Sequence, residues 1–453
     1  MLKIIKNKLL IITVVAIFLV INLLSCSNTA DNKQTKTDAT QEVADEFDEQ
    51  EIIKEIDKTR QVNFVNWKPE TESYWKELVK IYTEETGVVV NVETISDGVY
   101  FDELNKKLKS NNPPTLFEIN SYKDLEKIKQ YCYDLKNTEV HNNLFNDNFS
   151  LKSGDEILAI PYDLECYGII VNKKLLKQAG YSTKDINSFD DLQNVAEDIS
   201  SRQEQLGFTA FTSAGLEKNS AWRFNTHLMN MPIYFEYTDK NIVTTNKISG
   251  TYLDNFKILW DLYINNSTTD PDDLEKKTVD DARLEFINGD AVFYQNGSWD
   301  YNKLIDGGLL DTDLDIIPIY IGVGDEKKQG LCTGTENYWV VNKNAKQNDL
   351  DATLDFLKWC VTNPTALDCF ANDMGLSIPY KNAQVGENIF FKLDREIFDS
   401  GKTPVHWYFN TIPNEDWKEQ IRVSLVKYSI TQAPNDFEQF KKVFVDNWEK
   451  GYK

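Results

Sequence analysis

The alternation of short β-like runs with helical segments constrains the fold of this chain more than any other feature. It begins at Gln61, where a strand over 61–65 is followed by a helical pattern over 67–86. Strands that alternate with helices are typical of an α/β fold with mostly parallel sheets. Further strands are expected at 88–94, 115–119, 157–161, 168–172, 208–212, 291–294, 316–319 and 338–342. Further helices are expected at 101–109, from 124, at 173–179, at 190–205, from 221, and at 252–263, 280–287, 350–362 and 366–372.

Length and charge narrow the choice further. Roughly 390 of the 453 residues follow residue 60, which is more than one hydrophobic core normally serves, so two lobes are expected. The formal net charge of −23 argues against a nucleic-acid or anionic-lipid partner, because both need clustered lysine and arginine.

The N-terminus has the pattern of an export signal. Three lysines precede a largely apolar run over 9–24, which leads to Ser25 and Cys26. With Leu23 three residues before the cysteine, this segment resembles the bacterial lipobox. We therefore expect a lipoprotein signal peptide over 1–25 and lipid attachment to Cys26. A transmembrane anchor is the alternative, because the apolar run is nearly long enough to span a bilayer.

The segment after this cysteine has a composition that does not fold by itself. Residues 27–41 contain no aromatic residue and almost nothing apolar, while residues 42–60 are acidic with isoleucines at helical spacing. We therefore expect a lipid-anchored acidic tether over 26–60, flexible at first and helical later.

The remaining cysteines and the histidines lack the spacing of a metal site. No pair of cysteines forms a C-x-x-C, and the three histidines stand far apart, so we expect neither a metal site nor a cofactor. We expect mostly free, buried thiols, with one disulfide as the alternative that an extracytoplasmic setting leaves open. The cysteines concerned are Cys132, Cys166, Cys332, Cys360 and Cys369.

Motifs of catalysis are missing from the sequence. It contains no G-x-S-x-G elbow, P-loop, H-E-x-x-H or G-x-G-x-x-G. The acidic run of Asp311, Asp313 and Asp315 lacks the glycine and the closing glutamate of a calcium loop. We therefore expect a binding protein and not an enzyme. A surface glycan-degrading enzyme remains an alternative, because lipoproteins also carry hydrolases.

Four blocks of sequence, in this order, resemble extracellular solute-binding proteins of family 1, the maltose-binding type. The first is IPYDLECYGIIVNKKLL at 160–176, and the second is FINGDAVF followed by NGSW within 286–299. The third is GTENYWVV at 334–341, followed by a helical pattern over 352–360, and the fourth is DMGLSIP at 373–379.

This resemblance spans about residues 61 to 450 and implies a type II periplasmic-binding-protein-like fold. Each of its two lobes would be a mostly parallel sheet flanked by helices, and crossing hinge strands would join the lobes. The implied divisions are an N-lobe over 61–165 and 333–383, a C-lobe over 166–332, and C-terminal helices of the C-lobe and hinge over 384–453.

The resemblance also implies a function. A protein of this family captures a carbohydrate, which we expect to be an oligosaccharide, and delivers it to the permease subunits of an ABC importer. We expect a monomer on the extracellular face of the cell membrane, in a Gram-positive-type envelope, held by lipid on Cys26. A peptide, a polyamine or an anion is the alternative solute.

A cleft for sugar needs flat aromatic platforms surrounded by polar side chains. Loops at the carboxyl ends of strands supply such groups in open α/β sheets. On this ground the candidates are Trp67, Asn120, Tyr122, Trp222, Arg223 and Trp299. The resemblance adds Asp163, Glu165, Asn296, Glu336, His406, Trp407 and Trp417.

The resemblance places Glu165 at a position that hydrogen-bonds sugar hydroxyls and Trp299 at a stacking position. Gly297 beside this tryptophan would allow a close approach of the backbone. Core packing of the tryptophans, helix capping by Asn120 and a hinge role for Asp163 are the alternatives.

Overall fold

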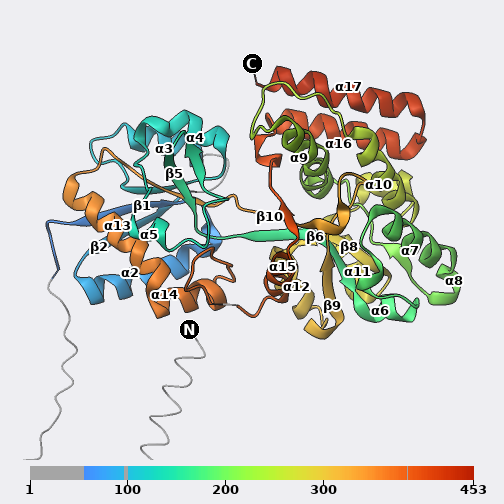
Figure 1. Cartoon of the computed structure of the whole chain (residues 1–453), viewed down its shortest axis with the longest axis horizontal. Coiled ribbons are helices and arrows are strands. Elements are labelled where there is room, and N and C mark those ends of the chain that lie inside the picture. Colours follow the sequence, from blue (N-terminus) through green and yellow to red (C-terminus); the bar gives the residue numbers. More distant parts are fainter. Residues whose placement is uncertain (1–55, 96–99, 385, 453) are drawn as a thin grey trace, which may run out of the picture.

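The computed structural model describes residues 56–95, 100–384 and 386–452, which form two α/β lobes (Figure 1). The predicted two-lobed α/β fold is confirmed. The signal peptide, Cys26 and all but the end of the tether lie outside the described residues. Among the residues that are described, no helix combines the length and apolar character needed to cross a membrane.

The N-lobe is built on a six-stranded sheet that joins early strands of the chain with one much later strand. In spatial order the strands are β2 (Val89–Thr94), β1 (Gln61–Asn66), β3 (Leu116–Ile119), β11 (Tyr338–Val341), β5 (Glu156–Pro161) and β4 (Leu151–Ser153). The helices of this lobe are α2 (Glu72–Thr86), α3 (Tyr100–Leu108), α4 (Tyr122–Ile128), α5 (Glu139–Asn142), α13 (Gln347–Thr362) and α14 (Pro364–Asp368). Trp75 of α2 packs against Trp339 of β11 in the core, with ring centroids 6.3 Å apart.

The C-lobe has its own sheet, which the chain enters through the crossing strand β6. Its strands are β12 (Thr403–Val405), β10 (Gln329–Gly334), β6 (Glu165–Asn172), β8 (Ala291–Gly297) and β7 (Thr209–Phe211), with β9 (Leu314–Ile317) beside β6. Its helices are α6 (Lys173–Gln178), α7 (Phe189–Ser201), α8 (Gln203–Leu206), α9 (Asn230–Lys240), α10 (Leu253–Asn265), α11 (Val279–Asn288), α12 (Tyr301–Asp306), α15 (Ile389–Asp399), α16 (Glu415–Thr431) and α17 (Pro434–Gly451).

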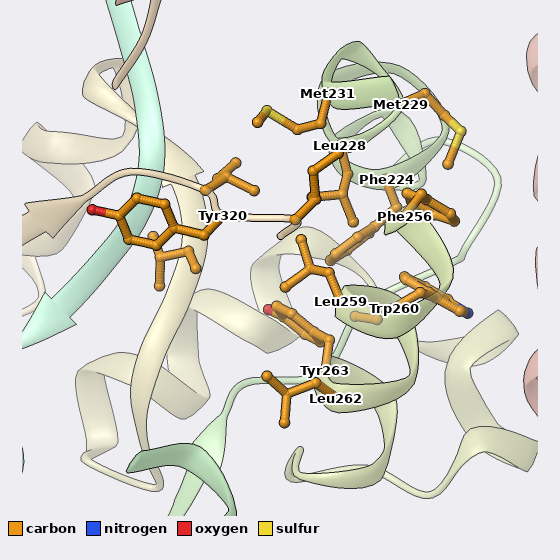
Figure 2. Packing of buried hydrophobic residues seen from close by; sticks show 14 of the residues in the cluster. Phe224, Leu228, Met229, Met231, Phe256, Leu259, Trp260, Leu262, Tyr263 and Tyr320 are labelled. Atoms are coloured by element: carbon orange, nitrogen blue, oxygen red, sulfur yellow. The ribbon is translucent and has the colours of Figure 1, made fainter. Parts of the chain in front are cut away.

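The main core of the C-lobe forms around α10. Its residues Phe256, Leu259, Trp260 and Tyr263 are buried and recur at the spacing of one helix face. Figure 2 shows this face meeting Phe224, whose ring centroid lies 5.3 Å from that of Trp260 in an edge-to-face contact. Aromatic pairs in this geometry add to the stabilisation from buried apolar area.

The strand directions correct one part of the prediction. Strand β1 runs parallel to β2 and β3, but β11 runs antiparallel to β3 and β5. In the C-lobe, β6 is antiparallel to β8, β9 and β10. The sheets are therefore mixed and not mostly parallel. One reason is that the chain leaves the N-lobe through β6 and returns through β10 and β11, so these two strands run against β6, β3 and β5.

Two element boundaries also differ from the prediction. The expected helix over 67–86 begins only at Glu72, after a 3₁₀ turn over Pro69–Thr71. Lys68 precedes a proline and is extended, because the proline ring disfavours the helical region for the residue before it. The expected helix over 366–372 ends as a π-helical turn over Cys369–Asp373.

The hinge is a buried hydrogen-bonded junction between the two crossing segments. Asp163 lies between β5 and β6, and its carboxylate accepts hydrogen bonds from Thr335 Oγ1 at 2.9 Å and from Asn337 Nδ2 at 2.8 Å. Both partners lie between β10 and β11. Lys68 Nζ completes the group at 3.5 Å from Asp163 Oδ2. The outgoing and returning segments are thus tied to each other and to the loop after β1.

The five cysteines that are described are all buried and free. This confirms the prediction of buried thiols and gives no support to the alternative of a disulfide. Burial raises the pKa of the Cys132 and Cys369 thiols to about 12. Thiols of this kind are chemically inert, because the thiolate is the reactive form.

Candidate functional site

A cleft of about 440 Å³ lies where the two lobes meet the hinge. The predicted residues Asn120, Glu165, Trp222, Trp299, Glu336 and Trp407 all line it. Its remaining lining residues are Thr226, His227, Phe409, Asn410 and Lys418. Its size falls within the range of small-molecule sites in proteins.

Strand ends bring these side chains together. Asn120 follows β3, and Trp299 lies in the 3₁₀ turn Ser298–Asp300 after β8. Trp407 follows the edge strand β12. Loops at the carboxyl ends of strands are where open α/β sheets bind ligands.

The two lining carboxylates come from the two crossing segments. Glu165 is the first residue of β6 and pairs with Gly334, the last residue of β10. Glu336 follows this glycine by two residues, so both acids lie at the hinge. Among the described residues, no group of three or more histidine, cysteine or acidic side chains could hold a metal ion.

The C-lobe side of the cleft is a wall of aromatic rings. The centroid of the Trp299 ring lies 6.0 Å from that of Trp222 and 6.4 Å from that of Trp407, with interplanar angles of 60° and 81°. The ring of His227 lies among them, 5.0 Å from Trp222 and 5.2 Å from Trp299. Phe409 contacts this histidine at 4.8 Å. The rings touch one another, so they form one continuous surface.

Two glycines let these tryptophans lie directly on the backbone. A Cβ atom at Gly297 would be 2.4 Å from the Trp299 ring, and one at Gly334 would be 2.5 Å from Cγ of Trp407. Real Cβ atoms do not approach other atoms so closely, so only glycine fits at both positions.

The charged groups of the lining carry both signs. Glu165 and Glu336 are acidic, whereas Lys418 is basic and pairs with the exposed Glu415 at 2.7 Å. Burial lowers the pKa of His227 to about 3, with smaller contributions from the positive charges of Lys418 and Arg223. The histidine is therefore uncharged at neutral pH.

Two smaller pockets adjoin the cleft and contain further predicted residues. One, of about 250 Å³, is lined by Trp67 and shares Asn120 with the cleft. The indole of Trp67 donates a hydrogen bond to Asn337 Oδ1 at 3.0 Å. The other pocket, of about 110 Å³, is lined by Tyr122 and His406 and shares Trp407 with the cleft.

The other candidates have structural partners and lie outside the cleft lining. Asp163 is the buried hinge acid described above. Arg223 is fully buried, where its Nε donates to the carbonyl of Gln295 at 2.9 Å. Asn296 is buried in β8 and donates to the hydroxyl of Tyr294.

Trp417 is also buried, between α16 and α17. Its indole donates a hydrogen bond to the carbonyl of Phe444 at 3.0 Å. Its ring centroid lies 5.2 Å from that of Phe444 and 5.4 Å from that of Trp448, both on α17. Trp417 is therefore a core residue, in agreement with the alternative that some of the tryptophans serve core packing.

The lining residues that the sequence did not reveal lie close to predicted ones. Thr226 and His227 come one helical turn after Trp222, and Lys418 directly follows Trp417. Successive residues of a helix point about 100° apart. An error of one residue in register therefore exchanges a cleft side chain for a core side chain. The aromatic stretch that begins at His406 indicates the region of Phe409 and Asn410, but the sequence does not determine which of its side chains face the cleft.

Comparison with known families gives one match. The model of a family described as bacterial extracellular solute-binding protein matches residues 77–395. A comparison with curated protein sequences finds no match.

Several solved structures share the fold. RafE from Streptococcus pneumoniae, in its apo form, is 17% identical with a TM-score of 0.67, over 87% of this chain and 98% of that chain. A family 1 extracellular solute-binding protein from Bifidobacterium longum subsp. infantis is 16% identical with a TM-score of 0.64, over 86% and 99%. The GacH receptor of Streptomyces glaucescens, solved unliganded and with acarbose, is 17% identical with a TM-score of 0.61, over 86% and 98%. At sequence identities this low, the similarity shows a shared fold and nothing more.

Proposed function

This chain belongs to the family of bacterial extracellular solute-binding proteins, and from this premise we propose its function. The proposal is that it captures a carbohydrate in the cleft between its lobes. The observation that carries it is the continuous aromatic wall of Trp222, Trp299 and Trp407, which faces a polar rim. A sugar ring has an apolar face of C–H groups and an edge of hydroxyls, and such a site matches both.

The shape of the wall favours sugar over an organic cation. Sites for quaternary ammonium groups place several aromatic faces around the cation. Here the aromatic side chains that line the cleft all come from the C-lobe side, and adjacent tryptophan rings contact one another with centroids 6.0 and 6.4 Å apart. The mixed signs of Glu165, Glu336 and Lys418 also favour an uncharged ligand over a polyamine or an anion.

The adjoining pockets support an oligosaccharide as the ligand. Each shares a lining residue with the main cleft, Asn120 on one side and Trp407 on the other. A ligand longer than one sugar unit could extend from the aromatic wall toward Trp67. Among the proteins that share the fold, RafE has been solved in complex with raffinose and GacH in complex with acarbose.

The proposal extends to the setting of the protein. Lipid on Cys26 would hold it on the extracellular face of the cell membrane, with residues 26–60 as tether, and permease subunits of an ABC importer would receive the sugar. The N-lobe would comprise residues 61–165 and 333–383. The C-lobe would comprise residues 166–332 and the helices of 384–453. The protein would act as a monomer, without a cofactor and without catalysis.

Calorimetry of the purified protein against a set of mono- and oligosaccharides tests the proposal. At least one sugar should bind, and Trp299→Ala should weaken its binding by about tenfold or more, because the stacking surface is lost. Trp359→Ala is the matched control, since this tryptophan lies in the N-lobe and bonds Glu85. Absence of binding to every sugar, with binding of spermidine instead, would contradict the proposal. Release of shorter products from labelled oligosaccharides would identify an enzyme.

A further inference from the structure

We propose that His227 is a specificity-determining residue of the cleft, which donates a hydrogen bond from its Nε2 to an oxygen of the ligand. This inference rests on the proposed binding of a carbohydrate and assigns a role to a residue that the sequence did not point to. Four features of the described structure carry it: the backbone of its turn, the packing of its ring, its charge, and the environment of its second nitrogen.

The backbone around His227 is a π-helical turn over Arg223–Leu228. Single π-helical turns are rare and are frequently found at functional sites. Phe224 and Leu228 of this turn point into the core beside α10 (Figure 2), while Thr226 and His227 line the cleft. The hydroxyl of Tyr167 donates to the carbonyl of His227 at 3.0 Å. The turn is therefore anchored on one side and presents its polar residues on the other.

The imidazole ring is held in one orientation. It stacks on Tyr167, with centroids 4.6 Å apart and an interplanar angle of 13°. Trp222 meets it edge to face at 5.0 Å, and Phe409 lies at 4.8 Å. Packing on several sides fixes the direction in which its polar atoms point, and a preorganised group of this kind binds without a further loss of freedom.

The ring is uncharged throughout the physiological range. Burial lowers the pKa of His227 to about 3, and the positive charges of Lys418 and Arg223 act in the same direction. The other ionisable groups around the site are the hydroxyl of Tyr167, whose pKa burial raises, and the cleft acids Glu165 and Glu336. A neutral imidazole has one nitrogen that donates and one that accepts.

The environment of Nδ1 indicates which nitrogen donates. This atom is buried and has no hydrogen-bond partner among the described residues. A buried N–H without an acceptor is rarer in proteins than a buried acceptor without a donor. The hydrogen is therefore assigned to Nε2, the nitrogen that remains to meet a ligand in the cleft. Sugar hydroxyl and ring oxygens accept such a bond, whereas an ammonium group cannot.

Two variants separate hydrogen bonding from packing. His227→Phe keeps an aromatic ring but removes the donor, while His227→Gln removes the ring and keeps an N–H near the position of Nε2. We expect His227→Phe to bind the sugar about ten- to a hundredfold more weakly, and His227→Gln to stay within about threefold of the wild type. The affinity of the wild type should also stay constant between pH 5 and pH 8, because the ring does not titrate there.

Calorimetry with the sugar from the screen provides the measurement, with thermal unfolding to check the fold. His141→Phe is the control, since His141 lies on α5 of the N-lobe. Full affinity in His227→Phe, or an equal loss in both variants with a lower melting temperature, would show that the ring only packs and would overturn the inference. If the wild type binds no sugar at all, the proposed function itself is wrong, which is a distinct result.

Discussion

At the scale of single residues, Gly297 determines how the central tryptophan of the wall lies. Its Cα is covered by the Trp299 ring, and an added Cβ would also come within 2.7 Å of the carbonyl of Cys166. Because the carbonyl belongs to the backbone of a crossing strand, the ring has to give way. We predict that Gly297→Ala displaces Trp299 and weakens sugar binding about tenfold, as measured by calorimetry.

Gly307→Ala is the matched control for this substitution. There the three atoms nearest to the added methyl group all belong to the side chain of Ile287, which can move without a shift of the backbone. This variant should bind sugar like the wild type. Equal losses of affinity in the two alanine variants would contradict the role given to Gly297.

A second residue with a measurable signature is Glu118, which is fully buried in β3, two residues before Asn120. One of its oxygens accepts a hydrogen bond from the backbone N–H of Trp67 at 2.8 Å, and the other has no partner among the described residues. Burial raises the pKa of this carboxyl to about 8. The acid is therefore largely protonated in the folded protein at neutral pH.

This pKa predicts a pH-dependent stability. A carboxyl that holds its proton more tightly when folded stabilises the protein below its ordinary pKa of 4.5, and this contribution is lost as the pH rises toward 8. Glu118→Gln mimics the protonated acid and should gain about 1–3 kcal/mol of unfolding free energy relative to the wild type between pH 5 and pH 8. Urea unfolding at both pH values measures this.

Comparison with the wild type is necessary because Asp394 also titrates in this range. Burial raises the pKa of its carboxyl to about 6, and its contribution is the same in both proteins. A difference between wild type and Glu118→Gln that does not change with pH would show that Glu118 is ionised in the folded state.

The sequence predicted side chains of the cleft well where they follow strands. Asn120 and Trp299 are such cases. The prediction was wrong on helix α16, where Lys418 lines the cleft and the predicted Trp417 is buried in the core. The pattern of α16 alone does not show which of its faces contacts α17 and which contacts the cleft. Arg223 failed for another reason: its guanidinium lies between the rings of Phe224 and Tyr294, a packing that no local pattern reveals.

At the scale of elements, α4 of the N-lobe contacts the C-lobe directly beside the cleft. Lys123 donates a hydrogen bond to the carbonyl of Pro413, and its Nζ lies 5.7 Å from the ring centroid of Tyr452. Both partners belong to the C-terminal part of the chain, which lies near α9 and α16 in Figure 1. The contact joins the two lobes independently of the hinge.

We predict that this contact slows the release of ligand. Lys123→Met removes the hydrogen bond between the lobes and should make the sugar dissociate about three- to tenfold faster in stopped-flow measurements of tryptophan fluorescence. The control is Lys127→Met on the same helix, because Lys127 pairs with Asp124 within the N-lobe. If both variants release sugar at the same rate, the contact has no part in holding the lobes together.

Strands and helices were predictable where their patterns were strong. Strand β10, QGLCTG, was not expected, because its two glycines give it little preference for a strand. It forms because β6 and β12 bond it on both sides. Strand β12 contains Pro404 and is tolerated because it lies at the edge of its sheet. In both cases the neighbouring strands, and not the local sequence, determine that a strand forms.

At the scale of the whole molecule, the proposed anchor can be separated from the binding domain. We predict that Cys26→Ala moves the protein from the cell fraction into the culture medium, because the lipid attachment site is lost. The released protein should bind sugar with unchanged affinity, since the cleft lies more than ninety residues further along the chain. Immunoblots of cells and medium measure the first effect, and calorimetry measures the second. Retention of the variant in membranes would favour the transmembrane alternative.

The pairing of β3 with β11 has a consequence for the order in which the molecule can be assembled. Phe117 lies opposite Val340, and most of the C-lobe is encoded between them. A chain that emerges from its N-terminus therefore exposes the apolar edge of β3 until the C-lobe has largely been made. Contacts so distant in sequence form slowly, because a long loop has to close first. The two lobes are thus separate in space but interleaved along the chain: the N-lobe is completed only after β11, α13 and α14 have been made, and the C-lobe only after β12, α16 and α17.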